Sequence, residues 1–560
     1  MEELTTTALP IGEEQLRHFM QVLQEYSAGL RQTRARVIAS ENWWKLRNAQ
    51  EEQAPGGYRS VSGWLHNVIV SKHADLMENY PEPVILPREA EDVDQARTLS
   101  AIIPCILEQN HFDGVWSDAM WQKCKTGTAC YKVTWDASAH GGLGDIAIRR
   151  VDLLNLYWEP GITDIQHSRY LFHTELRDKD LLEEEYPILR GKLRGNTFLD
   201  TKFLYDDRVD TSRKATVVEV YYRKGGILHY CKFVGNTVLF ATENQLEPDA
   251  GGQPMAQRGL YDHGRYPYEF DPLFPMEGSP CGYGYVDVCR SPQTEIDLMK
   301  TSFVRNAQVG ATPRFFSRQD GAVNEGEFLD LARPIVHVAG DLGEDSLRQI
   351  PFHGLDGVYV SLLDRTIQEL RETSGNTETS TGNIASGVTA ASAIVALQEA
   401  SGKGSRDAVQ SGYRCFGRIV ETVIELIRQF YTLPRKFRIL GRFGAEEFVT
   451  YDNGALTAQP YGELFGEDMG LRLPVFDVKI TAQKRNAYAR MTQNELAMQF
   501  FQLGFFDPGR ADQAMQCLEM MEFEGRDQML RRLAESAKQW TVAQSAAAAR
   551  FPGLPGKAMA

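Results

Sequence analysis

The chain has 560 residues, of which 42% are hydrophobic, and it carries a formal net charge of −15. This length predicts several domain-sized units, each with a core of its own. Proteins that grip DNA by neutralising its phosphates usually have a basic balance or a basic patch, so the acidic charge argues against a sequence-reading DNA binder. The charge still allows a protein whose wall DNA slides past.

The eight cysteines show none of the C-x-x-C spacing that is typical of zinc and redox sites. They are therefore expected to be buried free thiols in a reducing compartment. The N-terminal sequence lacks the basic flank and the apolar core of a signal peptide. No stretch reaches the ~18 consecutive apolar residues that a membrane span requires. These features predict a soluble intracellular protein.

Helical and strand patterns alternate in the N-terminal half of the chain. Apolar residues recur at helical spacing in four segments, residues 13–47, 63–79, 89–110 and 111–128. After Gly127 the period changes to that of strands, and two strand patterns meet at Gly225 and Gly226 in the manner of a β-hairpin. These patterns predict an α+β body for this half of the chain.

Two shorter helices are expected in the middle of the chain. The first runs from Ser291 to Thr312, and the second runs from about Leu355 to Thr373. A compact stretch with short strand patterns separates them. Residues 374–387 contain almost no apolar side chain, and this composition predicts a flexible loop.

A very long helical pattern follows over residues 388–431. Its glycines Gly402, Gly404 and Gly412 are expected to bend the helix or to break it locally. Strand patterns return at residues 436–442, 446–452 and 476–483. Residues 485–540 are again helical in pattern, and the tail 541–560 is expected to be disordered because it consists mainly of small residues, Pro and Gly.

The order of these elements resembles that of the portal proteins of tailed bacteriophages. In Tyr266–Ser302 a Pro-rich strand and a Gly-Ser-Pro-x-Gly-x-Gly turn lead into a helix with a Gln/Glu-rich start. The positions that carry this likeness are Gly278, Ser279, Pro280, Gly282, Gly284, Gln293 and Glu295. Ala385–Asp407 is similar to a portal tunnel loop that leads into the long wing helix, and Gly114–Asp136 is similar to a wing helix with its strand. The resemblance covers roughly residues 40–540.

The resemblance implies a portal fold of the α+β class, built from a wing, a two-helix stem, a small α/β clip and a helical crown. The implied boundaries are 1–290 and 388–484 for the wing, 291–312 and 354–373 for the stem helices, 313–353 for the clip, 374–387 for the tunnel loop, 485–540 for the crown and 541–560 for a disordered tail.

The resemblance also implies a function and a set of partners. Portal proteins form a ring, with twelve subunits expected here, at one vertex of the capsid, and double-stranded DNA passes through the ring during packaging and ejection. The expected partners are the terminase large subunit, a head-tail adaptor, and the major capsid and scaffolding proteins. The protein would belong to the virion, would assemble in the host cytoplasm and would be neither an enzyme nor a membrane protein.

The tunnel loop and the first stem helix supply the candidate DNA-facing residues. The loop offers the polar side chains Asn376, Thr377, Thr379, Ser380, Thr381 and Asn383. Such groups make weak, exchangeable contacts with phosphates, which suits a surface that DNA slides along better than a clamp of Lys and Arg would. On the stem helix Lys300 and Arg305 are candidate channel-facing cations, and salt bridges between subunits are an equally good interpretation of them.

No motif indicates catalysis, a metal or a cofactor. SGKGSRD, residues 401–407, lacks the G-x-x-x-x-G-K-[ST] spacing of a phosphate loop and is better explained as a kink in a helix. Asp92 with Asp94, or Asp206 with Asp207, could bind a metal, but such pairs are usually solvated charges. Six tryptophans, Trp43, Trp44, Trp116, Trp121, Trp135 and Trp158, are expected to pack in cores or interfaces rather than to stack on nucleic acid. The alternatives are a DNA-packaging enzyme such as a terminase or nuclease, and another head-tail adaptor protein.

Overall fold

The computed structural model describes residues 10–47, 60–193, 213–248, 252–311, 315–317, 324–329, 337, 347–349, 354–376, 403–440, 446–460, 463–464, 467–468, 471–484, 497–507, 510–519, 529–530 and 532–540. It contains two compact units. Unit 1 comprises Met1–Met77 and Pro81–Ala482, and unit 2 comprises Glu78–Tyr80 and Gln483–Ala560. Both helices and strands are well represented, so the α+β prediction is confirmed.

The N-terminal helical segment forms two helices, α1 (Glu13–Gly29) and α2 (Arg31–Trp44), which meet at Leu30. The helical pattern expected over residues 13–47 is therefore confirmed over most of that range, and it is divided at Leu30. Leu30 leaves helical geometry, with φ −91° and ψ 7°, and its side chain is buried. The break allows the two helices to pack differently, since α1 contacts the first strand of a large sheet whereas α2 contacts a later helix.

Three helices and one strand follow. They are α4 (Trp64–Glu78), β1 (Asn79–Pro87), α5 (Val93–Gln109) and α6 (Phe112–Thr126). The Pro-rich stretch after α4 forms strand β1, which pairs with β20 (Phe476–Lys484) in a two-stranded sheet. A strand of this kind tolerates proline because one edge of each strand needs no partner.

Two antiparallel sheets form the centre of unit 1. The three-stranded sheet has the order β3-β2-β9, and the five-stranded sheet has the order β4-β5-β6-β7-β8. Their strands are β2 (Thr128–Asp136), β3 (Asp145–Arg150), β4 (Leu156–Trp158), β5 (Tyr170–Asp178), β6 (Lys214–Lys224), β7 (Ile227–Val234), β8 (Thr237–Ala241) and β9 (Tyr268–Pro272). Lys224 pairs with Ile227 across Gly225 and Gly226, which confirms the predicted hairpin.

The first of the two middle helices is longer than expected. Helix α10 extends over Tyr285–Ala311 and begins six residues before Ser291. The carboxylate of Asp287 accepts a hydrogen bond from the Gly284 amide at 2.9 Å, and this contact closes the start of the helix. The sequence pattern missed the early start because the helix continues through Pro292.

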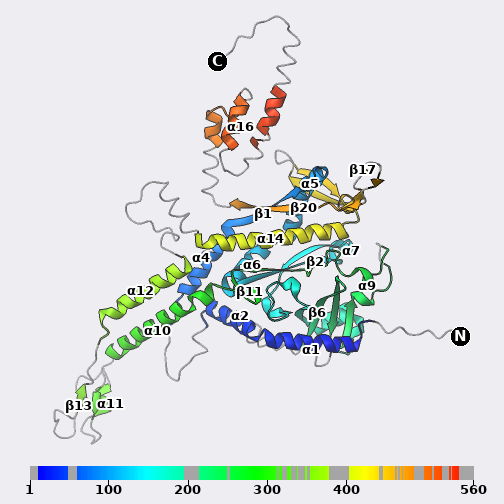
Figure 1. Ribbon diagram of the computed structural model, residues 1–560. Helices are drawn as coiled ribbons and strands as arrows, with labels where there is room; N and C mark the ends of the chain where they lie inside the picture. The colour runs from blue at the N-terminus through cyan, green and yellow to red at the C-terminus, as the bar shows by residue number, and fades with distance from the viewer. Residues whose placement is uncertain are drawn as a thin grey trace, which may run out of the picture. The chain divides into compact units, whose positions relative to one another are not determined.

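A small paired element and a second helix come next. Strands β12 (Phe315–Ser317) and β13 (Leu347–Gln349) pair in an antiparallel manner, and helix α11 (Glu325–Leu329) lies between them in sequence. Helix α12 (Gly357–Ser374) follows and contacts α10 along its length. The two helices run side by side in Figure 1.

The long helix α14 (Lys403–Phe430) runs through Gly404 and Gly412 without a break. The expected interruption at these two glycines is therefore wrong, and Gly402 lies outside the described residues. A side chain at position 412 would place its Cβ only 3.2 Å from Cη2 of Trp116. Gly412 therefore serves the close approach of α14 to α6 rather than a bend.

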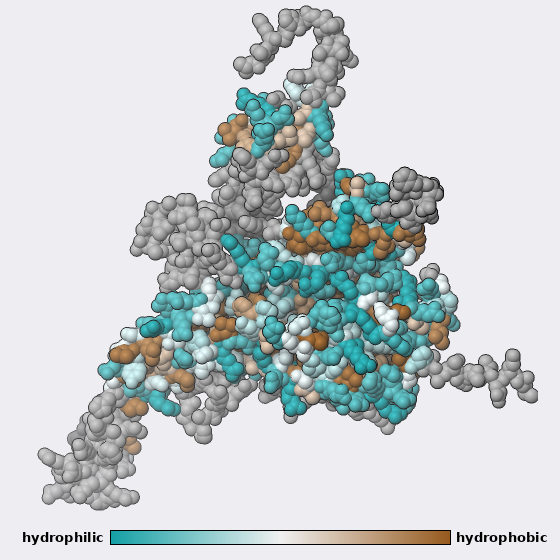
Figure 2. Space-filling model, in the orientation of Figure 1, coloured by the Kyte–Doolittle hydropathy of each residue, from teal (hydrophilic) through white to brown (hydrophobic). Residues whose placement is uncertain are grey.

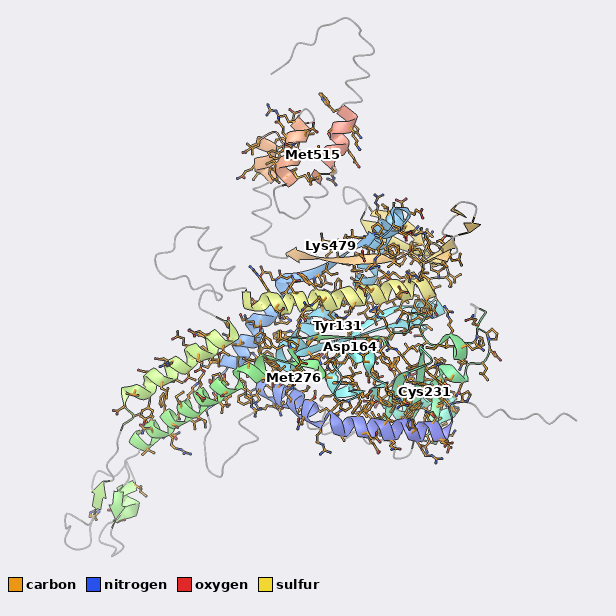
Figure 3. The ribbon with its side chains drawn as sticks, in the orientation of Figure 1. Tyr131, Asp164, Cys231, Met276, Lys479 and Met515 are labelled. Atoms are coloured by element: carbon orange, nitrogen blue, oxygen red, sulfur yellow. The ribbon has the colours of Figure 1, made fainter. Side chains whose placement is uncertain are left out.

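The apolar face of α14 supplies much of the core of unit 1. Its fully buried side chains include Cys415, Phe416, Ile419, Val420, Val423, Leu426 and Ile427. They lie over β2 and β9, where Tyr131 of β2 is completely buried beneath the helix (Figure 3). Phe416 contacts Trp116 of α6 edge to face, so α14 is fixed against both the sheet and a helix.

The remaining strands and the C-terminal helix complete the chain. Strands β14 (Arg435–Leu440) and β15 (Glu446–Tyr451) form an antiparallel pair, and the pairs β16 (Gln459–Pro460) with β19 (Leu471–Arg472) and β17 (Glu463–Leu464) with β18 (Glu467–Asp468) are short. Unit 2 contains helix α16 (Ala511–Glu519) and a core of Phe500, Ala514, Leu518 and Leu533. The predicted disordered tail 541–560 lies outside the described residues.

Candidate functional site

The paired helices α10 and α12 reach well beyond the core of unit 1. All buried side chains of α10 lie between Tyr285 and Asp297, and none lies between Leu298 and Ala311. That outer part has 14 residues and is about 20 Å long at an α-helical rise. This outer part of α10, together with the part of α12 beside it, forms an arm that extends from unit 1 (Figure 1). Most of its side chains are exposed rather than packed against the described core.

The exposed surface of this arm carries apolar side chains at helical spacing. On α10, Leu298 and Val309 are 53% and 39% exposed, and on α12, Val358 and Leu362 are 74% and 49% exposed. Residues 11 apart or four apart lie on one face of a helix. Figure 2 shows brown, hydrophobic patches over these two helices. Apolar stripes of this kind mark surfaces that another molecule covers.

The two predicted stem cations, Lys300 and Arg305, are both exposed on the outer part of α10. Five residues correspond to 500° of helical rotation, so the two side chains point about 140° apart. They therefore lie on different sides of the helix. Arg305 lies within about 20° of the stripe formed by Leu298 and Val309, whereas Lys300 lies on the opposite side of the helix.

A buried polar network joins the start of α4 to α10. The Asp297 carboxylate accepts hydrogen bonds from the Ser62 amide at 2.8 Å and from the Ser62 hydroxyl at 2.6 Å. The side-chain carbonyl of Gln293 accepts from the Leu65 amide at 2.9 Å, and its amide group donates to the Ser62 carbonyl at 3.0 Å. Gln293 and Asp297 are buried, so these bonds are not weakened by competing solvent.

The middle of α4 contacts the end of α12 and the start of α14 through one lysine. The Lys72 ammonium group is 3% exposed and donates to the Gly375 carbonyl at 3.3 Å and to the Ser405 hydroxyl at 3.2 Å. It also forms an ion pair with Asp75 at 3.5 Å. Ser405 in turn donates to the Asp75 carboxylate at 2.8 Å. One buried cation therefore contacts three helices of unit 1.

Of the six predicted loop residues, the structure describes only Asn376. Asn376 is 6% exposed, and its side-chain carbonyl accepts a hydrogen bond from the Ser71 hydroxyl at 3.1 Å. The backbone N–H of Asn376 donates to the Arg371 carbonyl at 2.9 Å. Asn376 thus belongs to the anchored end of α12 within the subunit. The other five predicted residues, Thr377, Thr379, Ser380, Thr381 and Asn383, lie outside the described residues.

A second buried lysine fixes α14 one turn further along. The Lys123 ammonium group of α6 contacts both carboxylate oxygens of Asp271 at 2.7 and 2.8 Å, and both side chains are 0% exposed. Lys123 also donates to the Ala408 carbonyl of α14 at 2.8 Å. Ser411 donates to Asp271 at 2.6 Å. This ion pair therefore joins α6, β9 and α14 in the core.

Asp92 and the tryptophans, which were also candidate site residues, make packing and ion-pair contacts within the subunit. Asp92 is buried and accepts hydrogen bonds from Arg472 at 2.9 and 3.1 Å, so its interpretation as a solvated charge is wrong, whereas the side chain of Asp94 is 90% exposed. The predicted packing of tryptophans is confirmed by Trp44, which stacks on His66 at 4.1 Å, and by Trp121, which stacks on His73 at 3.7 Å.

All eight cysteines are free, six are buried, and Cys105 and Cys517 are half-buried. In the parts of the chain that the structure describes, no group of three or more His, Cys, Asp and Glu side chains is placed to hold a metal ion. Within the same residues, no helix has both the length and the apolarity that crossing a bilayer demands.

Comparison with known families supplies the class of protein. The phage P22-like portal protein family matches residues 74–234 and 255–552, which together make up most of the chain. The chain belongs to this family, so it is a phage portal protein, and the family is one of structural rather than enzymatic proteins. Membership implies a ring assembly at the capsid vertex of the virion. A search of curated protein sequences finds no match.

The sequence patterns predicted the helices of this region but not the buried polar contacts between them. The periodic apolar residues of α10 and α12 are local signals, and they predicted both helices. Lys72 and Lys123 gave no signal, because a lysine in a helical pattern is usually solvated. The residues of other elements that they contact lie more than 140 residues away in sequence. Gln293 appeared only as part of the Gln/Glu-rich helix start, although its role here is a buried hydrogen-bonding one.

Proposed function

We propose that this chain forms a ring-shaped channel through which double-stranded DNA passes during packaging and ejection. The observation that carries the proposal is the exposed apolar stripe on each of the paired helices α10 and α12 in a member of the portal family. When each subunit offers the same two unlike faces to its neighbours, the contacts repeat by rotation and close into a ring. Twelve subunits are the expected number.

The parts of the subunit receive the following roles in this proposal. The helices α10 and α12 form the stem that surrounds DNA, and residues 313–353 form the clip at which the terminase large subunit and then a head-tail adaptor dock. Residues 485–540 form the crown, and the major capsid and scaffolding proteins bind the wing. The whole of helix α10 is about 40 Å long over its 27 residues, which is slightly more than one turn of B-form DNA.

The DNA-facing groups in this proposal are the hydroxyls and amides of Thr377, Thr379, Ser380, Thr381 and Asn383, with Asn376 as an anchor. A further candidate is one of the two cations Lys300 and Arg305. Because Arg305 lies near the apolar stripe of α10, it is better placed to contact a neighbouring subunit, and Lys300 is the better candidate for the channel. Few cations in the channel keep DNA free to slide.

Deletion of residues 377–383 tests this proposal. The shortened protein should still form rings, since Asn376 and Ser405 keep their contacts with α4. In an in vitro packaging reaction, the amount of DNA protected from nuclease should fall at least tenfold. A triple variant with Thr377→Ser, Thr379→Ser and Thr381→Ser keeps every hydroxyl and should package normally. Normal packaging by the deletion variant would refute the assigned role.

A further inference from the structure

Lys72 contacts two parts of the chain that flank one segment of sequence. Gly375 follows the last residue of α12, and Ser405 lies in the first turn of α14. The chain between them contains the residues proposed to face DNA. Lys72 donates to both flanking residues from a single nitrogen atom, at 3.3 and 3.2 Å. One side chain therefore contacts both ends of the segment.

The acceptors at this position match the three hydrogens of a lysine ammonium group. An ammonium group has three hydrogens, and here three acceptors surround it, which are the Gly375 carbonyl, the Ser405 hydroxyl and the Asp75 carboxylate. The Asp75 side chain is 40% exposed, so the charge of Lys72 is balanced by a group that remains partly hydrated. The ring of Tyr285 lies 5.9 Å from the same nitrogen and adds a cation–π contact from α10.

An apolar side chain would fill this position at a lower desolvation cost. Replacement of buried ion pairs by apolar groups is often neutral or stabilising, so a buried charge is better explained by the geometry that it specifies than by stability alone. A methyl group could pack against α12 or α14 in several ways, whereas hydrogen bonds to a carbonyl and a hydroxyl fix two distances at once. Ser71, one residue before Lys72, adds its bond to Asn376 at the same end of α12.

We propose that Lys72 is a positioning residue that holds the end of α12 and the start of α14 at a fixed separation, and thereby fixes both ends of the segment that faces DNA. The second half of this statement rests on the proposed function, whereas the first half does not. The positions of Gln293 and Asp297 extend the role to α4 as a whole, because its other end is bonded to α10. Helix α4 is thus the element that joins the stem to both ends of the segment.

Hydrogen exchange of the intact protein tests the first half. In Lys72→Met, amides of Gly375 and Asn376 at one end and of residues 406–408 at the other should exchange at least about tenfold faster, since bonds to a charged donor are lost at both ends together. Exchange in β6 should not change. The matched control is Lys125→Met, which removes a partly buried ion pair between Lys125 of α6 and Glu41 of α2 at 2.7 Å.

The control should accelerate exchange in α2 and α6 and leave the two ends unchanged. Acceleration at only one end in Lys72→Met, or equal acceleration in β6, would overturn the proposal. If Lys72→Met does not fold, Ser405→Ala tests the α14 end alone, because it removes one acceptor of Lys72 and the donor to Asp75 but leaves the bond to Gly375. Exchange should then rise in residues 406–408 only, and no rise there would overturn the proposal. Ser405→Thr keeps the hydroxyl and should behave as the natural protein does.

DNA retention tests the second half and separates it from the proposed function. Lys72→Met rings should lose packaged DNA at least about threefold faster than rings of Lys125→Met, measured as DNA that becomes nuclease-sensitive after packaging. Unchanged retention in Lys72→Met, when deletion of 377–383 impairs packaging, would refute the positioning role. If that deletion has no effect, the proposed function fails, and the exchange experiment still decides whether Lys72 holds the two ends.

Discussion

Removal of the Lys123 ammonium group should destabilise unit 1 more than most single substitutions. Lys123 and Asp271 are 0% exposed and contact each other at 2.7 and 2.8 Å. In Lys123→Met the Asp271 carboxylate stays buried with Ser411 as its remaining donor among the bonds described above. Breaking a buried pair by removal of one partner costs about 3–5 kcal/mol. For a unit of 479 residues the entropy of unfolding is about 1 kcal/mol/K, so we expect the Tm to fall by roughly 3–5 °C.

The assay is thermal unfolding followed by tryptophan fluorescence, since Trp116 lies next to Gly412 in the same part of the core. The double variant Lys123→Met with Asp271→Leu removes the uncompensated charge and should recover much of the lost stability. Lys45→Met is a matched control, because the pair of Lys45 with Glu41 at 3.5 Å is partly exposed and contributes about 1 kcal/mol or less. A Tm of Lys123→Met close to that of the control, or a double variant no more stable than the single one, would refute this reasoning.

Two further predictions concern titratable groups. Burial raises the pKa of Glu219, but Lys132 at 2.5 Å and His173 at 3.1 Å hold that pKa well below its ordinary value. The ionised Glu219 side chain therefore stabilises the fold above the unfolded pKa of about 4.3, and this stabilisation is lost as the pH falls towards the lower folded pKa. Glu219→Gln should lower the urea midpoint of unfolding at pH 7. Below pH 4 the difference in urea midpoint between the variant and the natural protein should shrink. Burial raises the pKa of the Cys124 and Cys281 thiols to about 12, and four further cysteines are also buried. A maleimide should therefore label only Cys105 and Cys517 in the folded protein, and all eight cysteines after unfolding. Rapid labelling of a third cysteine in the folded protein would contradict the packing of the core.

The elements that the sequence predicted well are those with a local periodic signal. The hairpin at Gly225 and Gly226 and the helices α10 and α12 each follow from residues within one or two turns of each other. The break at Leu30 did not follow, because both halves of the segment keep an apolar period and only the different partners of α1 and α2 require a bend. Local periodicity carries no information on such partners.

The candidate site was harder to predict, because its geometry depends on contacts between distant residues. Asn376 belongs to a polar stretch, and its burial depends on Ser71 of α4, which the composition of the stretch cannot reveal. Gly412 was misinterpreted for a similar reason, since helix propensity counts the glycine as a weak point and ignores the approach of Trp116. The two buried lysines are visible only once three helices have been brought together.

The central claim is that exposed apolar stripes on α10 and α12 bring identical subunits together around a channel. Electron microscopy of the purified full-length protein, compared with a variant carrying Val358→Glu and Leu362→Glu, tests this claim most directly. Both substitutions place charges on side chains that are 74% and 49% exposed in the subunit, so folding should be spared. The account predicts closed rings with a central hole for the natural chain and dispersed subunits for the variant. Dispersed natural subunits under all conditions, or intact rings of the variant, would contradict it.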